Sequence, residues 1–100
     1  MRLDEADRTP PFGFVMMYTV YVLSSLTDKK SYVGMTDDVE RRLMEHNSGR
    51  SSYTSRHMPW KIIYKEEYAT LEEAVGREKY LKSASGRRFL KRIFSSIEQG

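Results

Sequence analysis

The stretch SYVGMTDDVERRLMEHNSG, residues 31–49, predicts the end of a strand, a tight turn and one helix. Asp37 or Asp38 can cap a helix that begins near Val39, because an aspartate side chain accepts hydrogen bonds from the free N–H groups of the first turn. Gly49 closes this helix, since glycine adopts the left-handed conformation without steric cost. We therefore expect a strand that leads directly into a helix.

The charged residues of this helix divide between two faces. In a projection of about 100° per residue, Arg42 and His46 share the side of Val39, which is the side expected to face a core. Arg41 and Glu45 fall on the side that faces water. Burying an unpaired charge is costly, so an inward arginine and histidine must find partners or open onto a cleft.

Strands are predicted on both sides of this helix. YTVYVLSS (18–25) is rich in β-branched and aromatic residues, and a polar turn (26–30) joins it to residues 31–36 as a hairpin. A third strand is indicated by the alternation of WKIIYKEEY (60–68), with one face formed by Trp60, Ile62 and Tyr64. The residues between the helix and this strand, 48–59, are expected to form a polar loop.

Two helices are predicted after the third strand. TLEE (70–73) is a capping box, and the helix that it opens is expected to run to about Ser85, ahead of Gly86. Glu78 lies within the apolar stripe of this helix, formed by Leu71, Ala74 and Leu81. A last amphipathic helix is indicated by the spacing of Phe89, Leu90, Ile93, Phe94 and Ile97.

The composition indicates one small domain. The chain has 100 residues, of which 39% are hydrophobic and none is cysteine, so disulfides and thiolate metal sites are excluded. We expect a disordered or extended tail at 1–15 and a single domain at 16–98, in the order β-β-α-β-α-α. The longest apolar stretch, residues 12–23, is shorter than the roughly 20 residues of a membrane span. A cytoplasmic protein without a membrane segment is therefore expected.

Basic residues are concentrated in two stretches, although the net charge is only +3. Residues 77–92 contain seven basic residues and one acid, Glu78. Residues 48–61 contain basic side chains and no acid. This distribution indicates a polyanion as partner, and the alternative is an ordinary solvated basic surface.

Two tyrosines accompany the inward charges. Tyr21 and Tyr32 lie on neighbouring strands of the predicted hairpin, and either one taken alone is more often a core residue than a catalytic one. For the charges, the alternative to a functional site is a purely structural ion pair between Arg42 and Glu78.

The ordered set Thr19-Val20-Tyr21, Tyr32-Val33-Gly34, Arg42, His46 and Glu78 resembles the signature of the GIY-YIG nuclease superfamily, over roughly residues 17–92. The resemblance implies a small α/β domain of the α+β type, with a three-stranded antiparallel sheet flanked by helices. It also implies divalent-metal-dependent cleavage of DNA phosphodiesters, as in homing endonucleases and the excinuclease of excision repair.

The resemblance also implies roles for individual residues. Glu78 would bind Mg²⁺ or Mn²⁺, Arg42 would hold the scissile phosphate, and Tyr21, with a nearby cation favouring its phenolate form, would deprotonate the attacking water. Tyr32 would assist, and His46 would orient groups or relay protons. Gly34 either lets the DNA backbone approach the sheet or is simply a strand-end glycine. The other expected nucleic-acid-binding residues are Arg50, Arg56, Lys82, Arg87 and Arg88.

The sequence departs from the family pattern at several positions. Thr19 and Val20 replace the Gly-Ile pair, Met35 stands where some members have lysine or serine, and the only asparagine is Asn47. Three functions are therefore considered: a metal-dependent nuclease, a nucleic-acid-binding module with a weak or lost active site, and a structural or interaction role. Specificity is expected to come from the structure of the nucleic acid, from the loop at 48–59 or from a protein partner.

Overall fold

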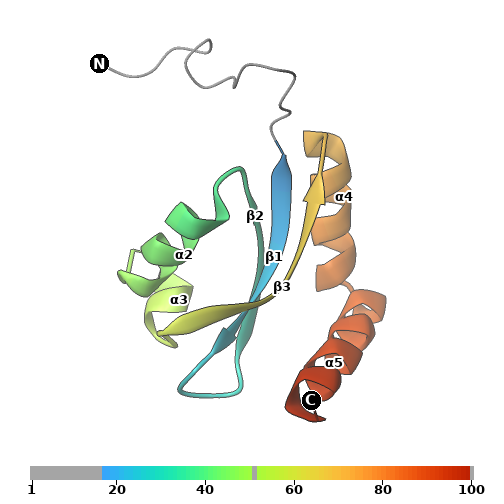
Figure 1. Ribbon diagram of the computed structural model, residues 1–100. Coiled ribbons are helices and arrows are strands. Elements are labelled where there is room, and N and C mark those ends of the chain that lie inside the picture. The colour runs from blue at the N-terminus through green and yellow to red at the C-terminus, as the bar shows by residue number, and fades with distance from the viewer. Residues whose placement is uncertain (1–16, 51, 100) are drawn as a thin grey trace, which may run out of the picture.

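The computed structural model describes residues 17–50 and 52–99. Figure 1 shows the elements, which are, in chain order, β1 (Tyr18–Ser25), β2 (Ser31–Thr36), α2 (Val39–Asn47), α3 (Ser52–Ser55), β3 (Trp60–Tyr68), α4 (Leu71–Lys82) and α5 (Ala84–Gln99). The predicted order β-β-α-β-α-α is confirmed, with the short α3 added to it. The predicted tail at 1–15 lies outside the described residues.

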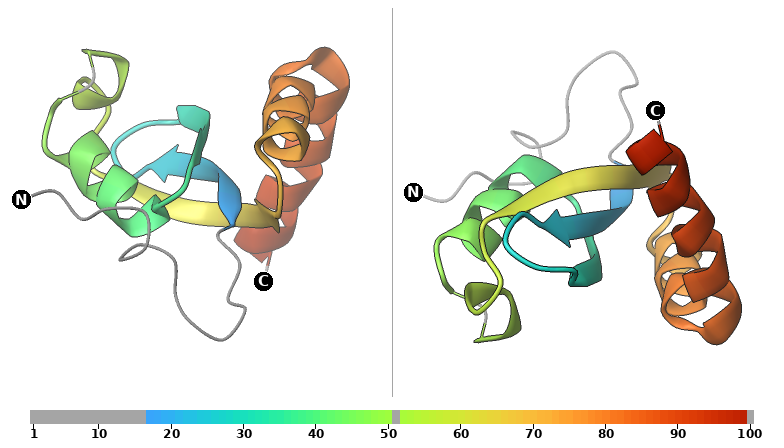
Figure 2. Two further views of the ribbon diagram at one scale, coloured as in Figure 1. Left: turned by 90° about the horizontal axis from the view of Figure 1, so that it is seen from above. Right: turned by 90° about the horizontal axis from the view of Figure 1, so that it is seen from below.

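The three strands form one antiparallel sheet in the order β2-β1-β3, so the first strand is central. Figure 2 shows the sheet between two layers, with α2 and α3 on one face and α4 and α5 on the other. This arrangement confirms the α+β fold expected from the sequence. None of the helices in the described ranges is long and apolar enough to cross a membrane.

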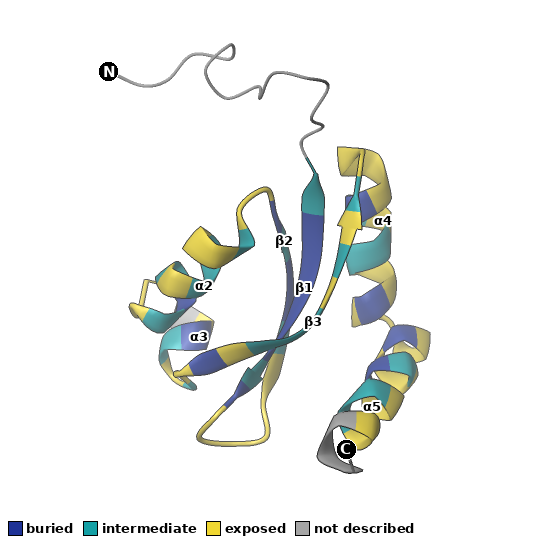
Figure 3. Ribbon diagram, viewed as in Figure 1, coloured by how far each residue is buried: buried dark blue, intermediate teal, exposed yellow. Residues whose placement is uncertain are grey.

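The central strand supplies side chains to two separate cores. Val20 and Val22 pack in the core under α4 and α5, whereas Tyr21 and Leu23 pack with Trp60 in the core under α2. Because successive side chains of a strand point to opposite faces, β1 is buried along most of its length, as Figure 3 shows. Tyr21 therefore belongs to the layer that contains α2.

An irregularity in β3 overturns the prediction that Trp60, Ile62 and Tyr64 share one face. Val22 of β1 lies opposite Tyr64, but the next residue of β1 lies opposite Ile62, so the register shifts by one residue at Ile63. Ile62 consequently packs with Trp60 in the core under α2, and Tyr64 packs in the core under α4 and α5. The bulge lets one strand serve both layers.

Both predicted helix caps after the first hairpin are confirmed. The Asp38 side chain accepts a hydrogen bond from the N–H of Arg41, and the Thr70 hydroxyl accepts one from Glu73. Gly49 has a φ of 84°, as expected for the residue that ends a helix.

The predicted boundary between the last two helices was wrong. The helix α4 ends at Lys82, and the hydroxyl of Ser83 accepts a hydrogen bond from the N–H of Gly86, so Ser83 caps the N-terminus of α5. Gly86 is buried in the first turn of α5, where a Cβ atom would overlap the backbone of Tyr80 and Leu81. This glycine permits close packing of two helices and does not terminate one.

Side chains secure the segment between α2 and β3. The side chain of Asn47 bonds the backbone of Trp60 in both directions, at 3.1 Å to its carbonyl and 2.6 Å from its N–H. The Ser25 hydroxyl donates to the carbonyl of His57 at 2.6 Å, and the His57 ring lies 2.7 Å from the Asp28 carboxylate. The segment expected to be a loop is therefore fixed against the sheet and includes α3.

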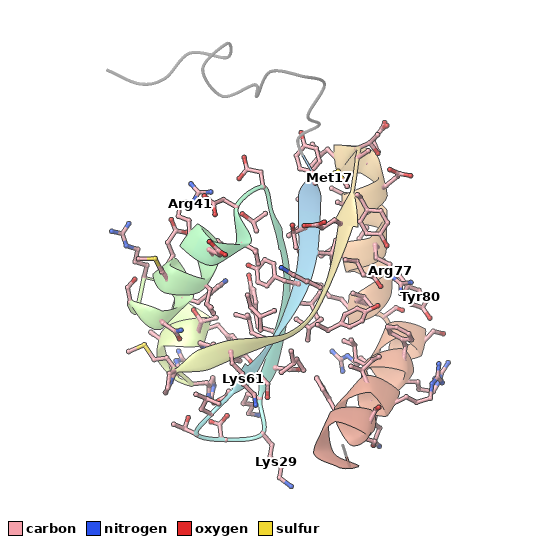
Figure 4. The ribbon with its side chains drawn as sticks, in the orientation of Figure 1. Met17, Lys29, Arg41, Lys61, Arg77 and Tyr80 are labelled. Atoms are coloured by element: carbon pink, nitrogen blue, oxygen red, sulfur yellow. The ribbon has the colours of Figure 1, made fainter. Side chains whose placement is uncertain are left out.

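Arg77 joins β3 to the helices on the other face. Its guanidinium group donates two hydrogen bonds to the Glu66 carboxylate, at 2.8 Å and 3.0 Å, and it lies over the rings of Tyr80 and Phe89. Figure 4 shows Arg77 and Tyr80 together beside α4. Burial alone would raise the pKa of Glu66, but the hydrogen bonds from Arg77 and two tyrosines lower it to about 2. Arg77 is thus a structural residue, although it belongs to the basic stretch.

Candidate active site

A buried chain of hydrogen bonds lies under α2. The Tyr21 hydroxyl is 2.9 Å from Nε2 of His46, and Nδ1 of His46 is 3.1 Å from the hydroxyl of Thr54. The three side chains are 1%, 0% and 0% exposed. The carbonyl of Thr54 in turn accepts a hydrogen bond from the Trp60 indole at 2.8 Å. The inward position predicted for His46 is confirmed, and its partners are the hydroxyls of Tyr21 and Thr54.

The protonation states of this chain follow from its burial. Burial raises the pKa of Tyr21 to about 12, and the charge of Arg42 lowers it only in part. Burial, with a smaller contribution from Arg42, lowers the pKa of His46. In the free protein near pH 7, Tyr21 is therefore a phenol and His46 a neutral imidazole. Since both partners of His46 are hydroxyls, which can donate or accept, the hydrogen bonds are satisfied in either tautomer.

Tyr32 completes an aromatic cluster next to this chain. Its ring centroid lies 4.7 Å from that of His46, 6.3 Å from that of Tyr21 and 6.2 Å from that of Tyr53. Tyr32 is only partly buried. The two tyrosines therefore converge as predicted, and the ring of His46, which belongs to α2, lies near both of them.

Gly34 lies beneath the two tyrosines. It pairs with Tyr21 across the hairpin, and a Cβ atom at this position would lie 2.9 Å from Cε2 of Tyr32 and closer still to the Tyr21 hydroxyl. A side chain here would therefore displace the tyrosines. The packing of the two tyrosines therefore requires glycine at this position even without bound nucleic acid. The expected contact of Gly34 with a DNA backbone stays a prediction.

Arg42 lies beside the tyrosines and does not pair with Glu78. Its guanidinium group is 2.8 Å from Oε1 of Glu45, one turn along α2, and the side chains of this pair are 34% and 29% exposed. Glu45, predicted to face water, is partly exposed and pairs with Arg42. Arg42 lowers the pKa of Tyr21, so its positive charge acts on the site.

Glu78 approaches the site from the other layer. It lies on α4, which contacts the edge strand β2 as well as β1, and its side chain is 23% exposed. Its carboxylate accepts a hydrogen bond from Lys82 at 3.1 Å. Its negative charge contributes to raising the pKa of Tyr21, so the two groups lie within electrostatic reach. The structural ion pair with Arg42 considered from the sequence is not formed.

The donor set fits a metal ion that is bound together with a substrate. Within residues 17–50 and 52–99, no three histidine or acidic side chains come together as a ready-made metal site. Mg²⁺ keeps several waters and needs one or two carboxylates when phosphate oxygens supply further ligands. Glu78 can supply one carboxylate, because its partner in the free protein is a lysine that is 53% exposed.

A groove opens next to the cluster of Tyr21, Tyr32, His46 and Tyr53, which we call the tyrosine cluster. Its volume is about 560 Å³, and its walls are β2, α3, the end of α4 and α5. Its aromatic and basic lining residues are Tyr32, Tyr53, Phe94, Lys82, Arg87 and Lys91. Two of the expected nucleic-acid-binding residues, Lys82 and Arg87, are thus brought together beside Tyr32.

The other expected nucleic-acid-binding residues lie elsewhere. Arg50 lines a separate hollow with Arg41 and Met44, and Arg88 lines one on the other side of α5 with Arg92. Arg56 is exposed just after α3. The sequence did not single out Thr54 or Tyr53, because their roles depend on how the segment after α2 packs on the sheet.

Comparisons with known proteins find a matching family profile and similar relatives. A family profile described as the GIY-YIG catalytic domain matches residues 17–92. A UPF0213 protein of Streptococcus pneumoniae serotype 4 is 44% identical over 64 residues, which are 63% of this chain and 64% of that protein. The match therefore spans somewhat less than two thirds of that relative's length. A UPF0213 protein of Staphylococcus epidermidis is 35% identical over 75 residues, which are 74% of this chain and 90% of that protein.

A solved structure is also similar. The solution NMR structure of a UPF0213 protein from Bacillus halodurans has a TM-score of 0.49 and 31% sequence identity, and the match covers 78% of this chain and 85% of that chain. The family assignment does not depend on it, because the profile match alone covers well over half of the sequence. This chain belongs to the GIY-YIG family.

Proposed function

We propose that this protein is a metal-dependent endonuclease that hydrolyses phosphodiester bonds of nucleic acid, with DNA as the expected substrate. Membership of the GIY-YIG family indicates a nuclease-like function. The observation that carries the proposal is the convergence of Tyr21 of β1 with Arg42 and His46 of α2, with the charge of Glu78 acting on the same tyrosine.

Arg42 would hold the scissile phosphate. A guanidinium group offers a fork of N–H donors that matches phosphate oxygens, and phosphoryl transfer depends mainly on positioning and charge stabilisation. In the free protein Arg42 is paired with Glu45, one turn away on the same helix. Because this pair is partly exposed, a phosphate can compete for the guanidinium group.

Tyr21 and His46 would move the proton of the attacking water. With a pKa of about 12, Tyr21 is not a phenolate in the free protein. Its hydroxyl can accept a proton from water only if it gives its own proton to another group. The neutral His46 ring, 2.9 Å from that hydroxyl, is the group in place to accept it.

Glu78 would hold Mg²⁺ or Mn²⁺, and such an ion supplies Lewis-acid stabilisation of the charge that develops on phosphate oxygens. The basic residues of the groove, Lys82, Arg87 and Lys91, would contact the backbone that leads away from the site. A protein partner that adds specificity and a cytoplasmic location are part of this proposal.

One observation favours a second function, which is nucleic-acid binding without cleavage. Tyr21 is 1% exposed and its hydroxyl is already hydrogen-bonded, so an attacking water reaches it only if the cluster moves. A binding module would use the same groove and the same salt-sensitive phosphate contacts.

A cleavage and binding assay distinguishes these two functions. It uses labelled single-stranded, duplex and branched DNA and RNA, incubated with Mg²⁺ or Mn²⁺ and, in parallel, with chelator. The matched variants are Arg42→Ala and Arg41→Ala, because the two arginines are adjacent and Arg41 pairs with Asp37 away from the tyrosines. We expect metal-dependent cleavage that is lost in Arg42→Ala and retained in Arg41→Ala. Binding without cleavage of any substrate would establish the second function, and equal loss in both variants would contradict the role given to Arg42.

A further inference from the structure

Lys82 both pairs with Glu78 and lines the groove. It is the last residue of α4, and its ammonium group lies 3.1 Å from Oε2 of Glu78. It also lines the groove beside Tyr32, together with Arg87 and Lys91. Its side chain is 53% exposed, so an incoming ligand can reach it.

We propose that Lys82 holds the Glu78 carboxylate in the free protein and passes to a backbone phosphate when nucleic acid enters the groove, so that nucleic-acid binding and metal binding promote each other. This inference rests on the proposed function, because it takes Glu78 as the metal ligand and the groove as a path of the nucleic-acid backbone.

The Glu78 carboxylate cannot favourably bind Lys82 and a divalent cation at the same time. An ammonium group beside the carboxylate repels a divalent cation that approaches the same oxygens. Ion pairs between partly exposed side chains four residues apart on a helix are weak, so Lys82 is easily drawn away. A phosphate in the groove offers it a new partner, and its departure leaves both Glu78 oxygens to the metal.

No other described basic residue combines these two contacts. Arg87 and Lys91 line the groove but are not paired with Glu78 within the described ranges. Lys79 is also near the end of α4, but it is exposed and forms no ion pair with any described residue. Lys79 therefore provides a control with the same charge, on the same helix, three residues before Lys82.

The coupling can be measured without any cleavage. Mn²⁺ binding is followed by its electron paramagnetic resonance signal, with and without single-stranded and duplex oligodeoxynucleotides whose phosphorothioate linkages resist hydrolysis. For the wild type we expect Mn²⁺ to bind more tightly with oligonucleotide than without it. By linkage, Mn²⁺ must then raise the affinity for the oligonucleotide by the same factor.

Lys82→Gln should bind Mn²⁺ alone about threefold to tenfold more tightly than the wild type, because the repelling charge has gone. Its coupling factor should fall by about the same ratio. Lys82→Arg keeps the charge and should behave like the wild type in both respects, and Lys79→Gln should leave the coupling factor unchanged.

The proposal is overturned if Lys82→Gln shows the Mn²⁺ affinity and the coupling factor of the wild type, or if Lys79→Gln changes them as much. It is also overturned if oligonucleotide does not raise Mn²⁺ affinity in the wild type. A protein that shows the coupling and its loss in Lys82→Gln, yet cleaves no substrate, supports the role of Lys82 and refutes the catalytic function.

Discussion

Replacing Glu78 by glutamine separates a catalytic carboxylate from a structural one. The carboxylate is 23% exposed and its partner Lys82 is 53% exposed, so the pair resembles a surface helix pair worth about 0.3–0.5 kcal/mol. In a domain of this size about 1 kcal/mol corresponds to 4–8 °C, so Glu78→Gln should lower the melting temperature by about 1–4 °C. Cleavage should nevertheless disappear, because an amide is a poor ligand for Mg²⁺.

Glu66→Gln provides the matched control, because it makes the same isosteric change at a carboxylate that is paired with Arg77 of α4. Glu66 is 18% exposed and receives two hydrogen bonds from Arg77 and one each from Tyr64 and Tyr68. Hydrogen bonds to charged groups contribute about 1.5–3 kcal/mol, so this variant should melt roughly 10 °C lower. Well below its melting temperature it should still cleave.

Melting curves and Mn²⁺ cleavage assays on the same two samples give the comparison. If Glu78→Gln cleaves as fast as the wild type, Glu78 is not part of the site. If it instead melts as low as Glu66→Gln, the carboxylate is structural and the reasoning from its exposure is refuted.

Three further predictions follow from individual contacts. The folded pKa of Glu66, about 2, lies below its ordinary value of 4.5, so its contribution to stability should be complete above pH 4.5 and decline as the pH falls toward 2; acid titration followed by circular dichroism should show this decline in the wild type and not in Glu66→Gln. Thr54→Val removes the hydroxyl partner of His46 and should cost about 1–3 kcal/mol in urea unfolding, with a shifted pH profile of cleavage. Gly34→Ala should destabilise the fold by about 1–3 kcal/mol, and adding Tyr21→Phe should recover part of this in a double-mutant melt, because the crowding is with the Tyr21 hydroxyl.

Local signals predicted much of the fold. The caps at Asp38 and Thr70 and the glycine after α2 involve neighbours within a few residues, and the structure contains all three. The helical projection correctly turned His46 inward because α2 is a regular helix with one face on the sheet. Helix caps and the buried face of a regular helix depend only on residues close together in the chain, so they can be predicted from the sequence.

Tertiary contacts explain the errors. The bulge at Ile63 depends on how β3 pairs with β1, and alternation within β3 alone cannot reveal it. Gly86 was taken for a helix end because glycine is typical there, whereas the structure uses it for close packing against Tyr80. Burial of Tyr21 outweighs the neighbouring cation, which is why the expected lowering of its pKa by Arg42 does not prevail.

The two-layered arrangement orders the assembly of the site in time. Tyr21, Tyr32, Arg42 and His46 all precede residue 50, whereas Glu78 lies on α4 and comes from the opposite side of the sheet. Because translation proceeds from the N-terminus, these four residues are synthesised before α4, and the proposed metal carboxylate is the last of the five. Under the proposed nuclease function, a nascent chain that ends before α4 lacks the metal carboxylate and should not cleave nucleic acid.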